Sequence, residues 1–423
     1  MEEFKKYKLG DICDLNKNSL KVSDTFDTIE YLDTSSITEN TIDSFQNFSR
    51  EDAPSRAQRK VQNETIIFST VRPNQNHFGL IQNPKTNLIV SSGFTTLDVK
   101  DKIEFDAKYL YYNLTQPSVV NFLQTLAQNS VSAYPSINPD DIGNLYLRFP
   151  EVSTQKKIAS VLSNIDRKIS VNREINRNLE ELAKQIYDYW FVQFDFPNEA
   201  GKPYKTSGGK MTFNTILKRE IPEGWYVTKL CSCIKHINTG LNPRDNFILG
   251  NGKIKYITVK NLTTDGIIDF SGCDLINEKA RVRVHERSQI TKDDILFASI
   301  SPLGRCYIIQ ETPEDWDINE SVFSIRPDQN IISPEYLYCY LTSEWFMKKA
   351  EKEATGSIFA GIRIAALNAM PIIVPDKNII KAFSSVLRPI FEEKEKLFNE
   401  IQYLVMLRDE LLPMLMNGQV EVK

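Results

Sequence analysis

Side chains that can hydrogen-bond the edges of nucleic-acid bases are concentrated in one short segment, Arg72-Pro73-Asn74-Gln75-Asn76-His77. An arginine can pair with guanine through two hydrogen bonds, and an asparagine or glutamine can pair with adenine in the same way. The proline favours a turn, which would present these side chains together. We take four residues of the segment as candidate contacts to DNA: Arg72, Asn74, Asn76 and His77.

Basic residues lie near this segment and again in the second half of the chain. The first group is Arg50, Arg56, Arg59 and Lys60, and the second is Arg281, Arg283, His285 and Arg287. In the second group the residues alternate, so on an extended segment all four would point to one side. A cationic stripe of this kind suits phosphates. An ordinary exposed strand face gives the same pattern, and the sequence leaves both interpretations open.

No set of residues has the spacing of a catalytic or metal site. Gly209-Lys210 fails as a phosphate-binding loop because Tyr204 stands where the first glycine should be and Met211 follows the lysine. The sequence Asn242-Pro243-Arg244-Asp245 lacks the second proline and the aromatic residue of an amino-methyltransferase loop. The three histidines have no metal-ligand spacing to one another or to the six cysteines. We therefore predict no catalytic residue and no metal site.

Bulk composition predicts a cytoplasmic protein of more than one domain. The chain has 423 residues, too many for one compact core. Its 51 basic and 55 acidic residues leave a net charge of −4, but binding to phosphates needs only a local basic face. No apolar run approaches the roughly 20 residues that span a bilayer. The charged start, Met1-Glu2-Glu3-Phe4-Lys5-Lys6, predicts no signal peptide.

The chain contains two copies of one unit. The segment Glu64–Pro73 aligns with Asp293–Pro302, and at the same offset Phe94 aligns with Phe323. At nearly the same offset Tyr109-Leu110-Tyr111 aligns with Tyr336-Leu337-Tyr338. Matches in the same order at a nearly constant offset indicate an internal duplication. The duplication places Ser301-Pro302-Leu303-Gly304-Arg305 opposite the 72–77 segment, which adds Ser301 and Arg305 to the candidate contacts.

Each copy ends in a heptad pattern, which predicts two long helices that pack together. The predicted seam of the first helix contains Ile158, Leu162, Ile165, Ile169, Leu179 and Ile186, and that of the second contains Leu387, Ile390, Leu397, Ile401, Leu404 and Leu411. Asn172 and Asn176 fill the gap in the first seam. Either they fix the register of the helices, or they lie where water or a partner subunit meets the helix.

These observations predict an α+β protein with two tandem domains of mixed α and β structure, each followed by a long helix. The expected segments are 1–150 (first globular domain), 151–196 (first long helix), 197–222 (a Gly/Pro-rich linker), 223–375 (second globular domain) and 376–423 (second long helix).

Motifs in the middle of the chain carry a resemblance to a known family. The run Tyr187-Asp188-Tyr189-Trp190-Phe191-Val192-Gln193-Phe194-Asp195-Phe196-Pro197, the segment Gly201–Lys205 with Gly208–Met211, and the segment Arg219–Trp225 resemble the central region of type I restriction-modification specificity subunits. The resemblance implies two target-recognition domains that read the halves of a split double-stranded DNA site. It also implies that the long helices pair as an antiparallel coiled coil.

The resemblance further implies partners and cofactors. The partners would be two methyltransferase subunits that bind S-adenosylmethionine, and ATP-driven restriction subunits, so this chain would bind neither cofactor. Members of the family have a short Gly-Ser turn, which here corresponds to Thr355-Gly356-Ser357 and adds Gly356 and Ser357 to the candidate contacts. The first half departs from it with Gln128-Asn129-Ser130. The alternatives are a helical adaptor that binds protein partners and a fused restriction or methylation enzyme, against which the missing motifs count.

Overall fold

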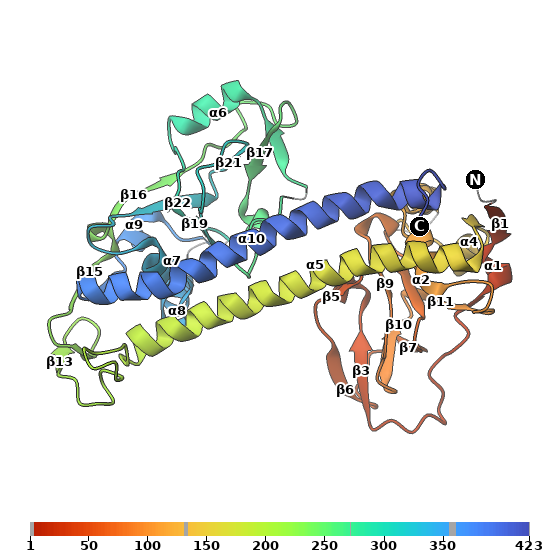
Figure 1. The fold of residues 1–423 in the computed structure, drawn as a ribbon, viewed down its shortest axis with the longest axis horizontal. Helices are drawn as coiled ribbons and strands as arrows, with labels where there is room; N and C mark the ends of the chain where they lie inside the picture. Colours follow the sequence, from red (N-terminus) through yellow and green to blue (C-terminus); the bar gives the residue numbers. More distant parts are fainter. Residues whose placement is uncertain (1–3, 131–133, 271, 355–360, 423) are drawn as a thin grey trace. The chain divides into compact units, whose positions relative to one another are not determined.

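Two long helices and two globular halves make up the fold. The computed structural model describes residues 4–130, 134–270, 272–354 and 361–422. It divides into Met1–Ile169 with Gln402–Lys423, called unit 1, and Ser170–Ile401, called unit 2. The long helices are α5 (Val152–Tyr187) and α10 (Lys377–Met416). Each unit contains one part of each long helix together with one globular half of the chain (Figure 1).

The globular half of unit 1 contains two four-stranded sheets. The first sheet is antiparallel, in the order β2 (Cys13–Leu15), β11 (Phe94–Val99), β8 (Ile66–Ser69) and β9 (Phe78–Leu80). The second has the order β6 (Gln46–Ser49), β3 (Thr28–Leu32), β10 (Leu88–Ser91) and β7 (Ala57–Lys60), and its β3–β10 pair is parallel. The pairs β1 (Lys5–Lys8) with β12 (Tyr146–Phe149) and β4 (Ile37–Thr38) with β5 (Thr41–Ile42) complete the strands. The helices are α1 (Leu9–Ile12), α2 (Ala107–Leu114), α3 (Pro117–Gln128) and α4 (Pro139–Gly143).

Unit 2 repeats this topology. Its antiparallel sheet has the order β16 (Ile234–Thr239), β22 (Val322–Pro327), β19 (Ile295–Ala298) and β20 (Cys306–Ile308). Its second sheet has the order β18 (Asp274–Ile276), β17 (Ile254–Ile257) and β21 (Trp316–Ile318), again with a parallel pair, β17–β21. The pair β15 (Tyr226–Lys229) with β23 (Pro371–Val374) matches β1–β12. The helices are α6 (Glu278–His285), α7 (Pro334–Thr342), α8 (Glu344–Glu353) and α9 (Ile364–Asn368).

The duplication inferred from the sequence is confirmed by this shared topology and by shared contacts. The Tyr109 hydroxyl donates to the carbonyl oxygen of Arg148 at 3.1 Å, and the aligned Tyr336 hydroxyl donates to that of Ile373 at 2.7 Å. In each unit the bond ties the first helix after the antiparallel sheet to the last strand. The mixed α and β fold is confirmed as well.

Residues of the long helices close the core of each unit. In unit 1, Leu412 and Leu415 of α10 belong to the same apolar cluster as Tyr109 and Phe149. In unit 2, the Phe191 ring, which follows α5, lies 4.7 Å from Tyr336 and 4.8 Å from Phe383 of α10, measured between ring centroids. The apolar stripe of each helix thus packs against a globular half as well as against the other helix.

The predicted seam residues all lie on the covered faces of the helices. The buried ones are Ile158, Leu162, Ile169, Leu387, Leu397 and Ile401, and the half-buried ones are Ile165, Leu179, Ile186, Ile390, Leu404 and Leu411. Within unit 2, Asn172 donates to Glu400 at 2.8 Å and the Trp190 ring lies 5.6 Å from the Phe383 ring. From Asn172 to Trp190 the contacted residue on α10 moves back from Glu400 to Phe383, so the two segments run antiparallel in this unit. A single coiled coil through both units stays a prediction.

The segment 197–222, predicted as a linker, is folded. It contains the hairpin β13 (Met211–Asn214) with β14 (Arg219–Pro222). The Phe196 ring stacks on Tyr204 at 4.6 Å and on Trp225 at 4.9 Å, and the Arg219 guanidinium lies 4.5 Å from the Phe194 ring centre. The motifs that carry the family resemblance therefore form one aromatic cluster in unit 2.

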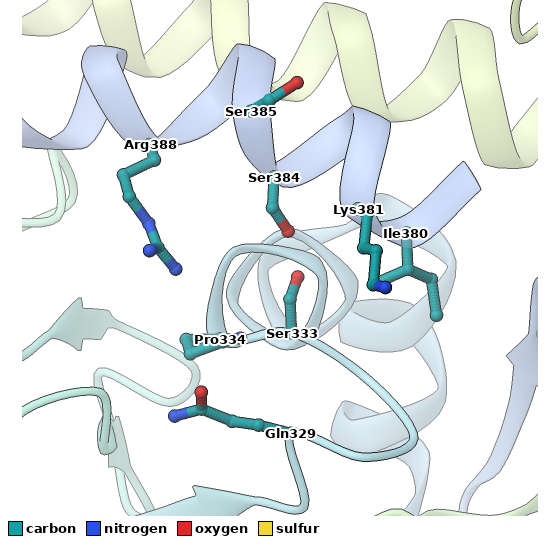
Figure 2. Close-up of a pocket in the computed structure, with 8 residues that line it drawn as sticks. All are labelled: Gln329, Ser333, Pro334, Ile380, Lys381, Ser384, Ser385 and Arg388. Atoms are coloured by element: carbon teal, nitrogen blue, oxygen red, sulfur yellow. The ribbon is translucent and has the colours of Figure 1, made fainter. Parts of the chain in front are cut away.

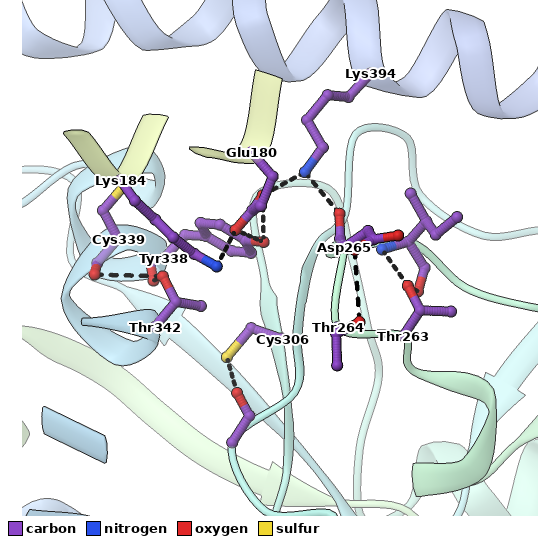
Figure 3. A network of polar contacts seen from close by, with 12 residues as sticks. Glu180, Lys184, Thr263, Thr264, Asp265, Cys306, Tyr338, Cys339, Thr342 and Lys394 are labelled. Carbon is purple, nitrogen blue, oxygen red and sulfur yellow. Dashed lines mark hydrogen bonds and ion pairs between the residues drawn. The ribbon is translucent and has the colours of Figure 1, made fainter. Parts of the chain in front are cut away.

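A buried polar network ties a turn of unit 2 to both long helices (Figure 3). Glu180 of α5 and Lys394 of α10 are each 3% exposed and form an ion pair. The Tyr338 hydroxyl donates to Glu180 at 3.0 Å, and the Lys394 ammonium donates to the carbonyl oxygen of Asp265 at 2.9 Å. Gly266 follows in the turn with a φ of 68°, and a β-carbon there would overlap the Tyr338 hydroxyl. Only glycine meets both requirements.

We expect removal of one partner of this pair to destabilise unit 2. Lys394→Met leaves the Glu180 carboxylate buried with weaker compensation, which should lower the free energy of unfolding by about 3–5 kcal/mol in urea titrations. The double variant Glu180→Gln/Lys394→Met should recover most of this loss because no buried charge is left. Lys396→Met, on the exposed side of the same helix, is the control and should change stability by about 0.5 kcal/mol or less. Equal losses in the single and double variants would contradict a buried ion pair.

The Asn176 amide should cost stability, because neither its oxygen nor its nitrogen has a hydrogen-bond partner among the described residues while the side chain is buried. Asn176→Leu should raise the free energy of unfolding by about 1–3 kcal/mol, the usual penalty of an unsatisfied buried polar group. Thermal unfolding of the purified chain measures the change. Asn178→Leu, at an exposed position on the same helix, is the control and should change the free energy of unfolding by about 0.5 kcal/mol or less. A lower melting temperature for Asn176→Leu would show that the amide is satisfied after all.

Candidate DNA interface

The 72–77 segment of unit 1 forms a tight turn between β8 and β9. A 3-10 turn, η2 (Pro73–Gln75), is flanked by Arg72 and Asn76, which both have positive φ, 48° and 56°. The Asn76 side chain donates to Glu39 at 2.8 Å, and His77 Nδ1 lies 2.6 Å from the carbonyl oxygen of Ile37. Asn76 and His77 are therefore held by the protein, whereas Arg72 and Asn74 are exposed.

A neighbouring aromatic ring supports the exposed Arg72. Its guanidinium carbon lies 5.3 Å from the Tyr134 ring centre, and its backbone N–H donates to the carbonyl oxygen of Pro135 at 2.9 Å. Val71 forms a β-bridge with Ser136, which fixes this approach of the two segments. The contact with Tyr134 was not predicted from the sequence, because no pattern near residue 72 indicates which distant residue will pack against it.

The other basic residues of unit 1 differ in what holds them. Arg50 donates to the carbonyl oxygen of Lys21 at 2.7 Å, and Arg59 donates to the Ser19 hydroxyl at 3.3 Å. Lys60 pairs with Asp24 at 2.7 Å, and this hydrogen bond lowers the pKa of the Asp24 carboxyl. Arg56 is exposed, and in the described part of the chain its side chain makes no hydrogen bond or ion pair. Of this group, Arg56 is the residue most available to a phosphate.

In unit 2 the prediction of an extended segment over residues 281–287 is wrong, because residues Glu278–His285 form helix α6. The Asn277 side chain caps the helix by accepting from the Ala280 N–H at 3.0 Å, and Ala280 and Val284 are buried one turn apart. This spacing buries one helical face, which overrides the two-residue alternation of basic side chains.

A buried aspartate holds two of these basic side chains. His285 Nε2 lies 2.8 Å from Asp317 Oδ2, and Arg281 Nε lies 3.8 Å from the same oxygen. Burial raises the pKa of Asp317 to about 6, against the opposing effect of His285 and Arg281. Arg283 donates to the carbonyl oxygen of Asn246, while Arg287 is exposed and its side chain makes no hydrogen bond or ion pair to another described residue. The four residues therefore do not form one cationic stripe.

The 301–305 loop of unit 2 lies at the edge that corresponds to Arg72. Ser301 is exposed, and Arg305 donates to the carbonyl oxygen of Leu262 at 2.9 Å. Ile300 forms a β-bridge with Gly361, as Val71 does with Ser136 in unit 1. The exposed Arg363 directly precedes α9 beside this bridge and was not among the predicted contacts. Gly356 and Ser357 lie outside the described residues.

A polar hollow of about 350 Å³ lies between α10 and the start of α7 in unit 2 (Figure 2). Arg388, Ser384 and Lys381 of α10 face Ser333, Pro334 and Gln329 across it. Arg388 donates to Glu335 at 2.9 Å, and this pairing raises the pKa of the arginine. Among the described ranges, no three His, Cys, Asp or Glu side chains are placed to hold a metal ion.

Comparison with known proteins agrees with the family resemblance. Residues 1–181 and 222–403 match the family described as type I restriction modification DNA specificity domain. The chain is 25% identical to the type I restriction enzyme MjaIX specificity subunit of Methanocaldococcus jannaschii, over 85% of this chain and 78% of that protein. It is 23% identical to the HindI specificity subunit of Haemophilus influenzae, over 99% of this chain and the whole of that protein.

A solved structure shares the fold. The crystal structure of a type I restriction-modification system S subunit from M. genitalium superposes with a TM-score of 0.56 at 17% identity, over 98% of this chain and 96% of that one. The family match covers both repeats of the chain, and each repeat consists of a globular part and a long helix. The resemblance inferred from the central motifs is therefore confirmed, and the chain belongs to the family of type I restriction-modification specificity subunits.

Proposed function

We propose that this chain reads a two-part double-stranded DNA sequence, one part with each unit, and that it assembles methyltransferase and restriction subunits on that DNA. The observation that carries the proposal is the duplicated topology with different exposed side chains at equivalent edges. Unit 1 presents Arg72 and Asn74 where unit 2 presents Ser301, and unit 2 adds Arg363. One scaffold with two sets of exposed side chains suits a target with two dissimilar halves.

The outer face of α5 supports the assembly part of the proposal. Large apolar side chains recur along α5 and the helical turn that follows it, at heptad-related positions, and are roughly two-fifths exposed: Val171, Ile175, Leu182, Tyr189 and Val192. A row of exposed apolar side chains along one helix marks an interaction surface. We assign this row to a methyltransferase subunit. S-adenosylmethionine and ATP would then be bound by the partner subunits, and the complex would act in the cytoplasm, where the DNA lies. None of the helices in the described residues is long and apolar enough to cross a membrane.

The two-part target is tested by mapping methylated adenines in the DNA of a host that carries the system. We expect two dissimilar short sequences separated by an unspecified gap. Replacing residues 1–150 with those of another family member should change one of the two sequences and leave the other as it was, because each unit folds around its own sheets. A continuous or palindromic target, or a replacement that alters both parts, would contradict the two-reader proposal.

The partner surface is tested by Leu182→Asp in the full chain. Leu182 is 43% exposed, so the chain itself should keep its melting temperature. Co-purification with the methyltransferase subunits should fall at least tenfold, because the charge would be desolvated in the complex. Glu181→Lys, a charge change at the adjacent exposed position, is the control and should co-purify normally. A Leu182→Asp chain that still binds both methyltransferase subunits would exclude this face as the docking surface.

A further inference from the structure

The geometry of unit 1 points to a specific base-reading pair: we propose that Arg72, supported by the Tyr134 ring, reads one guanine in the part of the target that unit 1 contacts. The inference rests on the proposed function and adds to it the residues and the base. No other exposed basic side chain of the candidate set in unit 1 is held in this manner. Three features of unit 1 carry it: the support of the guanidinium, the backbone that presents it, and the position of the edge.

The guanidinium is oriented without using its hydrogen-bond donors. Within the described residues it is held by the Tyr134 ring at 5.3 Å, with no hydrogen bond or ion pair to another side chain. By contrast, the side chains of Arg50, Arg59 and Lys60 already donate hydrogen bonds to oxygen atoms of the protein. A guanidinium supported through its face keeps its edge N–H groups free for a ligand. Two parallel acceptors such as guanine O6 and N7 match that edge.

The backbone presents Arg72 at a cost. Its φ of 48° and ψ of 67° place a residue other than glycine in the left-handed region, which residues with a side chain rarely adopt because of steric strain. Two features hold it there: Pro73 is buried in the turn, and the Arg72 N–H donates to Pro135. A phosphate contact tolerates a flexible side chain, whereas pairing with a base edge needs a fixed plane. The strained, doubly anchored backbone favours base reading.

The edge that carries Arg72 is repeated in unit 2 with other side chains. The bridge Val71–Ser136 brings Arg72 to Tyr134, and the equivalent bridge Ile300–Gly361 directly precedes Ser301. Arg363, two residues beyond Gly361, is exposed, and its side chain makes no hydrogen bond or ion pair with the rest of the described chain. The same edge is thus built in both units while its side chains differ. Side chains that vary on a constant edge are those expected to determine sequence preference.

The test uses the full chain in complex with its methyltransferase subunits. Methylation rates are measured on duplexes in which each base pair of the mapped target is replaced in turn. For Arg72→Ala we expect the preference for one G·C pair, in one part of the target, to fall by about five- to a hundredfold. Tyr134→Ala should lower the same preference by less, and Tyr134→Phe should keep it because the ring remains. Arg363→Ala is the matched control and should leave that pair unaffected.

Two results would overturn the inference. Arg72→Ala could keep the full preference at every pair, or it could slow methylation equally on all duplexes, as loss of a phosphate contact would. Where a variant methylates too slowly to measure, competition binding between original and replaced duplexes gives the same ratio. A wild-type complex without a two-part target would refute the proposed function itself. A wild-type complex with such a target and an Arg72→Ala variant of unchanged selectivity would refute this inference alone.

Discussion

The apolar core of each unit is closed by a helix that comes from the other half of the chain. Leu412 and Leu415 of α10 complete the core around Tyr109 and Phe149, and Ala183 and Tyr187 of α5 belong to the core of unit 2. Burial of such side chains is worth roughly 1.5–3 kcal/mol each. The sheets, the exposed edges and the turns of either unit therefore depend on the packing of both long helices.

Ion pairs between α5 and α10 add specificity to this packing. In unit 1 Asp166 of α5 pairs with Arg408 of α10 at 3.1 Å, and in unit 2 Glu180 of α5 pairs with Lys394 of α10. In both units the acid is on α5 and the base is on α10. Pairs of this kind contribute more to the choice of partner than to net stability, because desolvation offsets most of the attraction. They favour contact of α5 with α10 over contact of either helix with a copy of itself.

Most of the architecture could be predicted from sequence because its signals are local or repeated. The duplication, the long helices and the covered seam follow from residue spacing alone. Helix α6 was missed because the alternating arginines suggested a strand, although the Asn277 cap and the pair Ala280 and Val284 carry the helical signal. The partners of the basic residues could not be predicted. Contacts such as Lys60 with Asp24, or Arg72 with Tyr134, depend on which distant segments the sheets bring together.

The closing of each core by a helix from the other half bears on how the chain associates. Two molecules could exchange their second halves and keep the core contacts of each unit, since both units would still receive an α5 and an α10 segment. The folded 197–222 segment joins the halves and keeps them within short reach of one another. A short connection corresponds to an effective concentration in the millimolar range. At cellular concentrations well below that value, each α10 finds the α5 of its own molecule first, and domain swapping becomes a property of concentrated solutions.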